Sequence, residues 1–205
     1  MIKIENLKKS FGERVLFQNV NFNIESGEFL ILKGESGCGK TTLLNMVGAL
    51  EDPDSGKIFI DDKNIFDRKN QMWLYGEKIG FLFQNFALIE HKTVSENLNI
   101  IKKKYRSEIT IEKSLEKVGL ADKLDSKVYT LSGGEQQRVA LARLMLKKCD
   151  IILADEPTGS LDRENADKVI EILKTMNSQG KTIIMVTHDE LYQKIGTHYI
   201  KIKDL

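Results

Sequence analysis

Short apolar runs separated by turn-forming residues mark the N-terminal part of the chain. Apolar and polar side chains alternate over residues 2–7, and further apolar runs follow in residues 20–24, 28–33 and 57–61. Glycine, proline, aspartate and serine lie between these runs, as is typical between β-strands. Residues 40–50 instead have a helical pattern. The N-terminal part is therefore predicted to consist of strands interrupted by one helix.

The C-terminal part has the order strand, helix, strand. Residues 151–154 and 182–186 are apolar runs rich in β-formers, and residues 165–176 between them are compatible with a helix. Two strands joined in this way normally lie parallel in one sheet. This order predicts an α/β protein built on a parallel sheet.

A region rich in lysine and glutamate lies between these two parts. Residues 94–104 and 110–118 have the pattern of amphipathic helices. We interpret residues 85–131, approximately, as a helical lobe inserted into the α/β core. No internal repeat or long linker divides the sequence, so we expect one domain over residues 1–205.

The charge of the chain is balanced. Lysine and arginine total 31, aspartate and glutamate total 30, and the formal net charge is +1. This balance gives no electrostatic reason to expect a nucleic-acid partner.

Nothing in the sequence predicts a membrane span or a secretory signal. The apolar runs, such as residues 29–32 and 79–83, are of strand length and fall short of the roughly 20 residues that cross a bilayer. The two cysteines, Cys38 and Cys149, are too few for a disulfide framework. We therefore expect a cytosolic protein, and any involvement of a membrane must come through a partner protein.

The strongest local motif is a full match to G-x-x-x-x-G-K-[ST] between an apolar strand and a helix. Its residues are Gly34, Glu35, Ser36, Gly37, Cys38, Gly39, Lys40 and Thr41, and Thr42 follows. Glycines let the backbone N–H groups point at phosphate oxygens, and the helix N-terminus adds a positive dipole. Lys40 supplies a charge for the β- and γ-phosphates, and the Thr41 hydroxyl is a candidate Mg²⁺ ligand. The alternative is a glycine-rich turn before an ordinary helix.

A second motif places two carboxylates, Asp155 and Glu156, at the end of the apolar run 151–154. Open α/β sheets bind ligands at the carboxyl ends of their strands. Asp155 is a candidate for the magnesium shell, and Glu156 is a candidate to orient or deprotonate an attacking water. A lone Asp-Glu pair at a strand end is more often a solvated turn, so this assignment depends on the phosphate loop.

The third motif has two explanations. Ser132 followed three residues later by Glu135 is a capping box, which opens a helix over residues 136–147. Capping alone does not explain Gly133 and Gly134, which cost about 1 kcal/mol each relative to alanine in a helix. A helix start with free N–H groups and no bulky side chain also binds phosphate.

The segment Leu131 to Arg138 closely resembles the signature motif of ATP-binding cassette (ABC) proteins, usually L-S-G-G-Q, with Glu135 in place of the commonest glutamine. The family's other landmarks follow the same order along nearly the whole chain. Phe11 resembles the aromatic that stacks on adenine, Gln84 the Q-loop glutamine, Asp162 the D-loop aspartate, and His188 the switch histidine. Taken singly, each of these matches is weak: Phe11 could be a core aromatic, Gln84 a polar strand end, and His188 a histidine with satisfied hydrogen bonds at a helix start. Trp73 has no counterpart and is interpreted as packing.

The resemblance implies an ABC ATPase core, with a mixed sheet, an N-terminal antiparallel β part and an inserted helical lobe. It also implies a head-to-tail homodimer that binds and hydrolyses ATP with Mg²⁺. In one subunit Lys40, Gln84, Glu156 and His188 are the expected catalytic set, and Thr41, Gln84 and Asp155 the expected magnesium ligands. Ser132, Gly133, Gly134 and Glu135 of the other subunit are expected to cover the γ-phosphate, with Asp162 acting across the interface.

The resemblance further implies an integral membrane permease as partner and a peripheral position on the inner face of the plasma membrane. The segments around Gln84, Ser132 and Glu156 look most like the subgroup for lipoprotein release, macrolide efflux and antimicrobial-peptide or bacteriocin export. A regulator that acts mechanically on a membrane partner is the main alternative. ABC proteins of chromosome maintenance or translation are a further alternative. They are expected to have fused cassettes, a long coiled-coil insertion or a basic face, and the sequence contains none of these features. A nucleotide kinase or GTPase has no use for the paired glycines, and the guanine-binding Asn-Lys-x-Asp motif is missing from the sequence.

Overall fold

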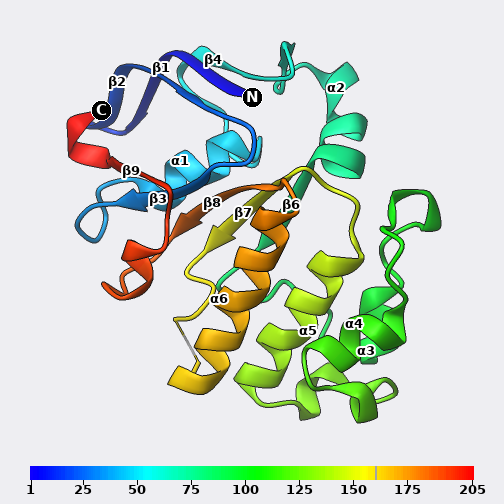
Figure 1. The fold of residues 1–205 in the computed structure, drawn as a ribbon. Coiled ribbons are helices and arrows are strands. Elements are labelled where there is room, and N and C mark those ends of the chain that lie inside the picture. The colour runs from blue at the N-terminus through cyan, green and yellow to red at the C-terminus, as the bar shows by residue number, and fades with distance from the viewer. Residues whose placement is uncertain (160) are drawn as a thin grey trace.

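The computed structural model describes residues 1–159 and 161–205, which form two sheets and the helices around them (Figure 1). The antiparallel sheet has the order β2-β1-β4-β5, and the parallel sheet has the order β6-β7-β8-β3-β9. The strands are β1 (Ile2–Phe11), β2 (Arg14–Ile24), β3 (Phe29–Lys33), β4 (Ser55–Ile60), β5 (Lys63–Asn64), β6 (Ile79–Leu82), β7 (Ile151–Asp155), β8 (Thr182–Val186) and β9 (His198–Lys201). The α-helices are α1 (Lys40–Val47), α2 (Arg68–Trp73), α3 (Val94–Leu98), α4 (Ile111–Lys117), α5 (Gly133–Leu146) and α6 (Arg163–Ser178).

The parallel sheet is apolar on both faces because its strands are buried on both sides. In β3, Phe29 and Ile31 belong to one hydrophobic cluster, whereas Leu30 and Leu32 belong to the other. The first cluster lies under α5 and α6. The second includes α1 and the inner face of the antiparallel sheet. In Figure 1, α1 accordingly lies between the two sheets, and α5 and α6 cover the opposite face of the parallel sheet.

The parallel order brings the carboxyl ends of β3, β6, β7 and β8 to one edge of the sheet. At this edge the chain enters the Gly34–Thr41 loop after β3, Gln84 follows β6, Glu156 follows β7 and His188 follows β8. The topology alone therefore gathers the segments that the sequence assigned to phosphate chemistry.

The helix expected over residues 40–50 is shorter than predicted. It ends at Val47, Gly48 is its C-cap, and Ala49 has a left-handed φ of +52°. The prediction of a helix over residues 94–104 was also wrong in its length. The α3 helix ends at Leu98, and the chain then turns, because Arg106 binds the Ile101 carbonyl at 2.8 Å and the Asn99 side chain at 2.9 Å.

The helix after the signature segment begins at Gly133, three residues before the expected start, so both glycines lie in its first turn. Strand β9 and helix α2 were not anticipated.

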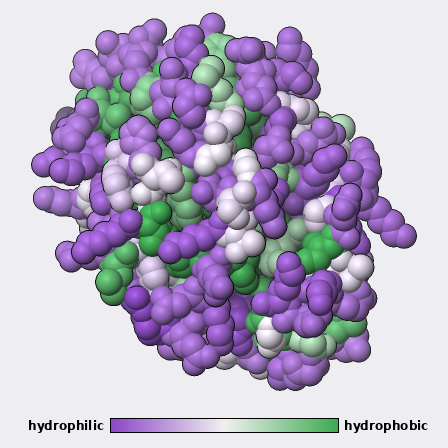
Figure 2. Space-filling model, viewed as in Figure 1, coloured by the Kyte–Doolittle hydropathy of each residue, from purple (hydrophilic) through white to green (hydrophobic). Residues whose placement is uncertain are grey.

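Hydrophilic side chains cover most of the α5–α6 face, with smaller apolar patches between them (Figure 2). Across residues 1–159 and 161–205, none of the helices has both the length and the apolar character needed to cross a bilayer.

Candidate functional site

The loop between β3 and α1 has a backbone that only glycine adopts easily. Gly37 has a φ of +77° and Gly39 a φ of +106°. A Cβ on Gly39 would lie 2.9 Å from Cζ of Phe17, so a larger residue is excluded by contact as well as by conformation. The loop is thereby curled over the start of α1.

The N-terminus of α1 has no side-chain cap, and its first turn carries no acidic residue. In contrast, α3, α4, α5 and α6 each begin with a side chain that accepts a hydrogen bond from a first-turn amide, and only the six-residue helix α2 shares the uncapped start of α1 among the described α-helices. Unsatisfied amides and the helix dipole both favour an anion at this position. The amides at the start of α1 are therefore free to bind a phosphate.

Lys40 occupies the centre of the loop and is buried. Its Nζ donates to the carbonyl oxygens of Gly34 at 2.9 Å and of Glu35 at 2.7 Å. These are neutral acceptors within the same loop. An anion beside Lys40 would add a charge-assisted hydrogen bond, which is the stronger kind.

Two oxygen-bearing side chains face each other beside Lys40. The Thr41 hydroxyl donates to Oδ1 of Asp155 at 3.1 Å, although the two residues are far apart in the sequence. Burial raises the pKa of Asp155 above its usual range, against the hydrogen bond from Thr41, which lowers it. A cation at this position would favour the ionised form of Asp155.

Glu156 is held in a sparsely populated backbone conformation with a φ of +45°. The amide of His188 donates to its Oε2 at 3.3 Å, and Nε2 of His188 lies 3.2 Å from Oε1. The second approach lacks hydrogen-bonding geometry, so within the described part of the chain the buried Oε1 has no hydrogen-bond partner. Burial also raises the pKa of Glu156. A strained, incompletely satisfied carboxylate of this kind is typical of a functional position.

Lys40, Thr41, Glu156 and His188 line one cleft of about 440 Å³, whereas Asp155 lines an adjoining cavity that shares Gln84 with it. Nine of the predicted site residues contribute to the wall of the cleft: Ser36, Gly37, Gly39, Lys40, Thr41, Thr42, Gln84, Glu156 and His188. Gly34, Glu35 and Cys38 complete the loop around Lys40. The cleft therefore combines a cation, an uncapped helix start and a carboxylate.

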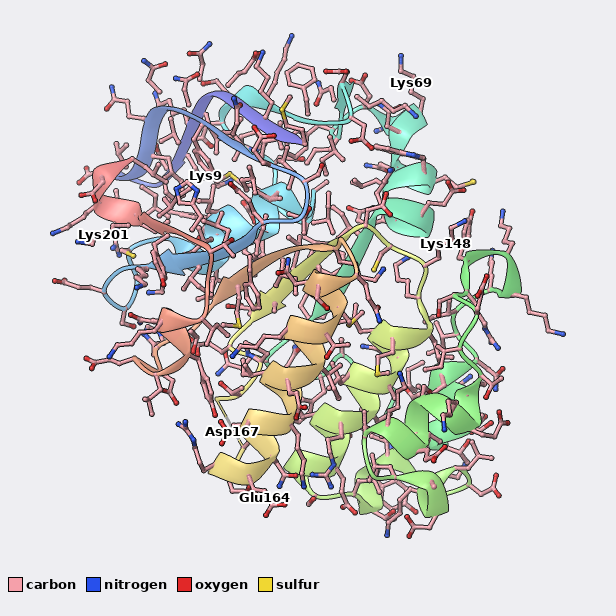
Figure 3. All side chains as sticks on the ribbon, in the orientation of Figure 1. Lys9, Lys69, Lys148, Glu164, Asp167 and Lys201 are labelled. Carbon is pink, nitrogen blue, oxygen red and sulfur yellow. The ribbon has the colours of Figure 1, made fainter. Side chains whose placement is uncertain are left out.

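Phe11 lies outside this cleft, at the tip of the β1–β2 hairpin, with 51% of its surface exposed. Its partner across the hairpin is Arg14, which donates to the Gly37 carbonyl at 2.9 Å and so ties the hairpin to the phosphate loop. Nζ of Lys9, labelled in Figure 3, lies 4.9 Å from the centre of the Phe11 ring. Arg14 was not identified from the sequence, because its acceptor is a backbone carbonyl.

The capping box at the start of α5 is confirmed. The Ser132 hydroxyl accepts from the Glu135 amide at 3.2 Å, and Oε2 of Glu135 accepts from the Ser132 amide at 2.8 Å. This amide lowers the pKa of Glu135. None of the four signature residues lines the cleft, and Figure 1 shows the start of α5 well away from the loop between β3 and α1.

The two signature glycines are not required by the packing of their own chain. Neither has a positive φ. A Cβ on Gly133 would come no closer than 4.0 Å to Phe86, and one on Gly134 no closer than 3.5 Å to Leu161, which are ordinary contacts. The packing of the described chain therefore does not account for two glycines at this helix start.

Asp162 is the N-cap of α6, where it accepts from the Asn165 amide at 2.9 Å. This hydrogen bond lowers the pKa of Asp162. The preceding Ser160, which belongs to the expected D-loop, lies outside the described residues. Asp167, labelled on α6 in Figure 3, accepts from the Tyr192 hydroxyl at 2.6 Å and thus joins α6 to the segment after His188. Burial and this carboxylate raise the pKa of Tyr192 to about 12.

Comparison with known families decides the identity of this fold and cleft. Residues 17–159 match the ABC transporter family. The chain belongs to that family. It is an ABC ATPase domain, and the resemblance and the fold class derived from the sequence are both confirmed.

The relatives of this ABC domain include both separate subunits and longer proteins. The macrolide export ATP-binding/permease protein MacB of Campylobacter jejuni is 42% identical over the whole chain, which spans only 33% of that protein. An uncharacterized ABC transporter ATP-binding protein of Methanocaldococcus jannaschii, MJ1508, is 40% identical, and here the chain spans 96% of the relative. The ATP-binding cassette MJ0796, solved as a dimer in a post-hydrolysis state with ADP and Pi, superposes with a TM-score of 0.85 at 36% identity, covering 98% of this chain and 94% of that one.

Proposed function

We propose that this ABC ATPase domain binds Mg·ATP, hydrolyses it as a head-to-tail homodimer and thereby powers a separate membrane permease. The observation that carries the proposal is the convergence of Lys40, Thr41 and Glu156 on one cleft at an uncapped helix N-terminus. These groups supply phosphate binding and water activation in the same place.

ATP binding begins at the phosphate loop. The phosphates lie against the N–H groups of the loop and of the α1 start, and Lys40 exchanges its carbonyl acceptors for phosphate oxygens. Adenine stacks on the exposed face of Phe11, and Arg14 holds that hairpin at a fixed position relative to Gly37. The adenine and the phosphates are thus bound by two parts of the chain that Arg14 connects.

The donor set fits Mg²⁺. The Thr41 hydroxyl donates to the Asp155 carboxylate, and Gln84 lines the cleft with Thr41 and the adjoining cavity with Asp155. Hydroxyl, carboxylate and amide oxygens are the hard ligands that Mg²⁺ takes, and Mg²⁺ is usually bound through one or two carboxylates together with substrate phosphates. When bound, Mg²⁺ neutralises charge on the phosphates.

Hydrolysis is assigned to Glu156. Glu156 lines the cleft, and its carboxylate accepts a proton from the attacking water; its Oε1, which is buried in this structure, has no hydrogen-bond partner within the described part of the chain. His188 fixes the carboxylate through its amide and sets its imidazole 3.2 Å from Oε1. Gln84 extends the polar wall of the cleft toward the γ-phosphate.

The dimer supplies the remaining contacts. Ser132, Gly133, Gly134 and Glu135 of one subunit cover the γ-phosphate held by the other, which accounts for glycines that the chain's own packing does not need. Asp162 lies at the start of the neighbouring helix and acts across the same interface. Because the γ-phosphate contacts exist only before hydrolysis, ATP closes the dimer and its hydrolysis reopens it.

The permease docks on the lobe formed by residues 85–131. An apolar groove of about 290 Å³ lies where this lobe meets the core, and Phe83, Ala87 and Ile100 contribute to its wall. Ile100 is 49% exposed. MacB combines ATP-binding and permease functions in one protein, and its name, macrolide export, supports export of a drug-like substrate by this system. Export of a peptide or lipoprotein rests on the sequence resemblance alone. The domain is then peripheral on the cytoplasmic face of the plasma membrane.

Two experiments test these assignments. Purified wild-type protein should hydrolyse ATP only with Mg²⁺ present, and both Lys40→Ala and Glu156→Gln should lose at least about 100-fold in kcat. In cells that carry the natural permease, wild-type protein should sediment with membranes and Ile100→Glu should not. Met72→Glu, at a more exposed apolar residue on α2, is the matched control. Equal retention of both variants would contradict the docking site.

A further inference from the structure

Arg143 lies near the C-terminal end of α5 and contacts the loop that follows Gln84. Its Nη2 donates to the carbonyl oxygen of Phe86 at 2.8 Å, and its Nη1 donates to that of Ala87 at 2.5 Å. Burial lowers the pKa of Arg143, and within the described residues no carboxylate offsets that cost. Removing a guanidinium from water costs free energy. The hydrogen bonds to two backbone carbonyls offset part of this cost, which indicates a specific role for the contact.

The loop that Arg143 holds is strained. Phe86 and Ala87 have left-handed φ values of +62° and +48°, two consecutive non-glycine residues in a region that such residues rarely adopt. Gln84 precedes them and lines the ATP cleft. The strain persists only while the surroundings impose it, and Arg143 binds both carbonyls of the strained pair.

Helix α5 links this loop to the signature segment. Arg143, near the C-terminal end of the helix, binds the loop, and Gly133 is the first residue of the same helix. Arg143 and Gly133 are ten residues apart, or about 15 Å along a helix. The loop after Gln84 is therefore attached to the helix whose other end carries the signature residues.

We propose that Arg143 is a positioning residue that couples the two ATP sites of the dimer. The inference rests on the proposed function, in which Gln84 belongs to one ATP site and the signature residues of the same chain cover the other. A shift of α5 when its signature residues meet the partner's ATP is passed by Arg143 to the Phe86–Ala87 backbone and so to Gln84. Each subunit then senses both nucleotides through one rigid helix.

Lys147 provides a matched control in the structure. It follows α5, its Nζ donates to the carbonyls of Tyr75 at 2.5 Å and Gly76 at 3.0 Å, and burial lowers its pKa as well. Its chemistry resembles that of Arg143, and as the C-cap of α5 it lies four residues further along the chain. Its acceptors, however, lie before β6 and not in the loop after Gln84. A general loss of buried cation contacts should affect both residues, whereas coupling should depend on Arg143 alone.

The test measures the ATPase activity of the full chain as a function of ATP concentration for wild type, Arg143→Met, Arg143→Lys and Lys147→Met. Arg143→Met should lower kcat about 10-fold, reduce the Hill coefficient from near 2 to near 1, and change the half-saturating ATP concentration by less than about 2-fold. Arg143→Lys, which keeps one donor group, should restore part of both values. Lys147→Met should keep the wild-type Hill coefficient even if its Tm falls.

Each other outcome overturns the inference. An unchanged Hill coefficient in both Arg143 variants, or an equal loss in Lys147→Met, would reduce Arg143 to a structural contact. Active wild-type protein without cooperativity would contradict the coupling while leaving the proposed function intact. Wild-type protein that fails to hydrolyse Mg·ATP at all would remove the proposed function, and the inference with it.

Discussion

Nε2 of His188 lies 3.2 Å from Oε1 of Glu156, while the amide of the same histidine donates to Oε2 at 3.3 Å. His188, in the segment after β8, thus approaches both carboxylate oxygens of Glu156, which follows β7. The pairing holds Glu156 in place without satisfying it, since the imidazole contact lacks hydrogen-bonding geometry. Incomplete hydrogen bonding of this buried carboxylate lowers the stability of the folded state, and it leaves Glu156 able to accept a proton.

That cost predicts the pH dependence of a Glu156→Gln variant. Because burial raises the pKa of Glu156 in the folded state, the folded protein binds this proton more tightly than the unfolded chain. Wild-type stability therefore falls as pH rises from the unfolded to the folded pKa, and the loss is constant above it. Glu156→Gln should gain roughly 1 kcal/mol at pH 7, or about 2–4 °C in Tm, and nothing at pH 4 or below. Thermal melts of both proteins across this range measure the difference.

Glu135→Gln is the control with the opposite sign. The Ser132 amide lowers the pKa of Glu135, so its ionised form stabilises the fold above the unfolded pKa, and this contribution is lost as pH falls through the folded pKa. The variant should be slightly less stable than wild type at pH 7 and equal to it at low pH. A Glu156→Gln variant that is less stable than wild type at neutral pH would contradict the account of the buried carboxylate.

The two explanations of Ser132 make different predictions for Ser132→Ala. Loss of the cap alone should cost about 1 kcal/mol in stability. Thr110 caps α4 through the same kind of bond, accepting from the Lys113 amide at 3.2 Å, and lies outside the proposed ATP-binding surfaces. Thr110→Ala should therefore show the same stability loss. If Ser132 also binds the partner's γ-phosphate, only Ser132→Ala should lose about 10-fold or more in kcat. Equal ATPase activity in the two variants would leave Ser132 as a cap.

Phe11→Ala should weaken ATP binding with little change in stability. Loss of an aromatic stacked on a base costs about 1–3 kcal/mol, so the Kd for ATP should rise about 10-fold. Phe11 is 51% exposed, and its removal should change the free energy of unfolding by less than about 0.5 kcal/mol. Val15→Ala, at an apolar residue that is 53% exposed on the same hairpin, is the control. Calorimetric titration with ATP distinguishes them, and equal Kd values would remove Phe11 from the site.

Features determined by local pattern were predictable from the sequence. The phosphate loop lies between an apolar run and a helix, and the spacing of its glycines identifies it without tertiary information. In the structure these glycines have positive φ values. Asp155 ends, and Glu156 follows, a strand that is apolar on both faces, as is typical of a parallel sheet, and both therefore lie at its carboxyl edge. The Ser132–Glu135 capping box is likewise a local pattern.

Features that depend on a distant backbone were not predictable. Arg14 and Arg143 both act on carbonyl groups far along the chain, and a carbonyl leaves no trace in a residue pattern. The early end of α3 depends on contacts that are closer in sequence but equally absent from the apolar pattern, since Arg106 binds the Asn99 side chain and the Ile101 carbonyl. Strand β9 is short and mostly exposed, and its pairing with β3 is its main support.

The central claim, an ATP-held pair of chains, is tested most directly by size-exclusion chromatography with light scattering on Glu156→Gln. The variant should bind ATP without hydrolysing it, so a closed pair should accumulate with twice the chain mass of 23.3 kDa. We expect this dimer with Mg·ATP, a monomer with Mg·ADP or without nucleotide, and a monomer under all conditions when Lys40→Ala is added. A Glu156→Gln protein that stays monomeric with bound Mg·ATP, or a dimer that forms equally without nucleotide, would contradict the account.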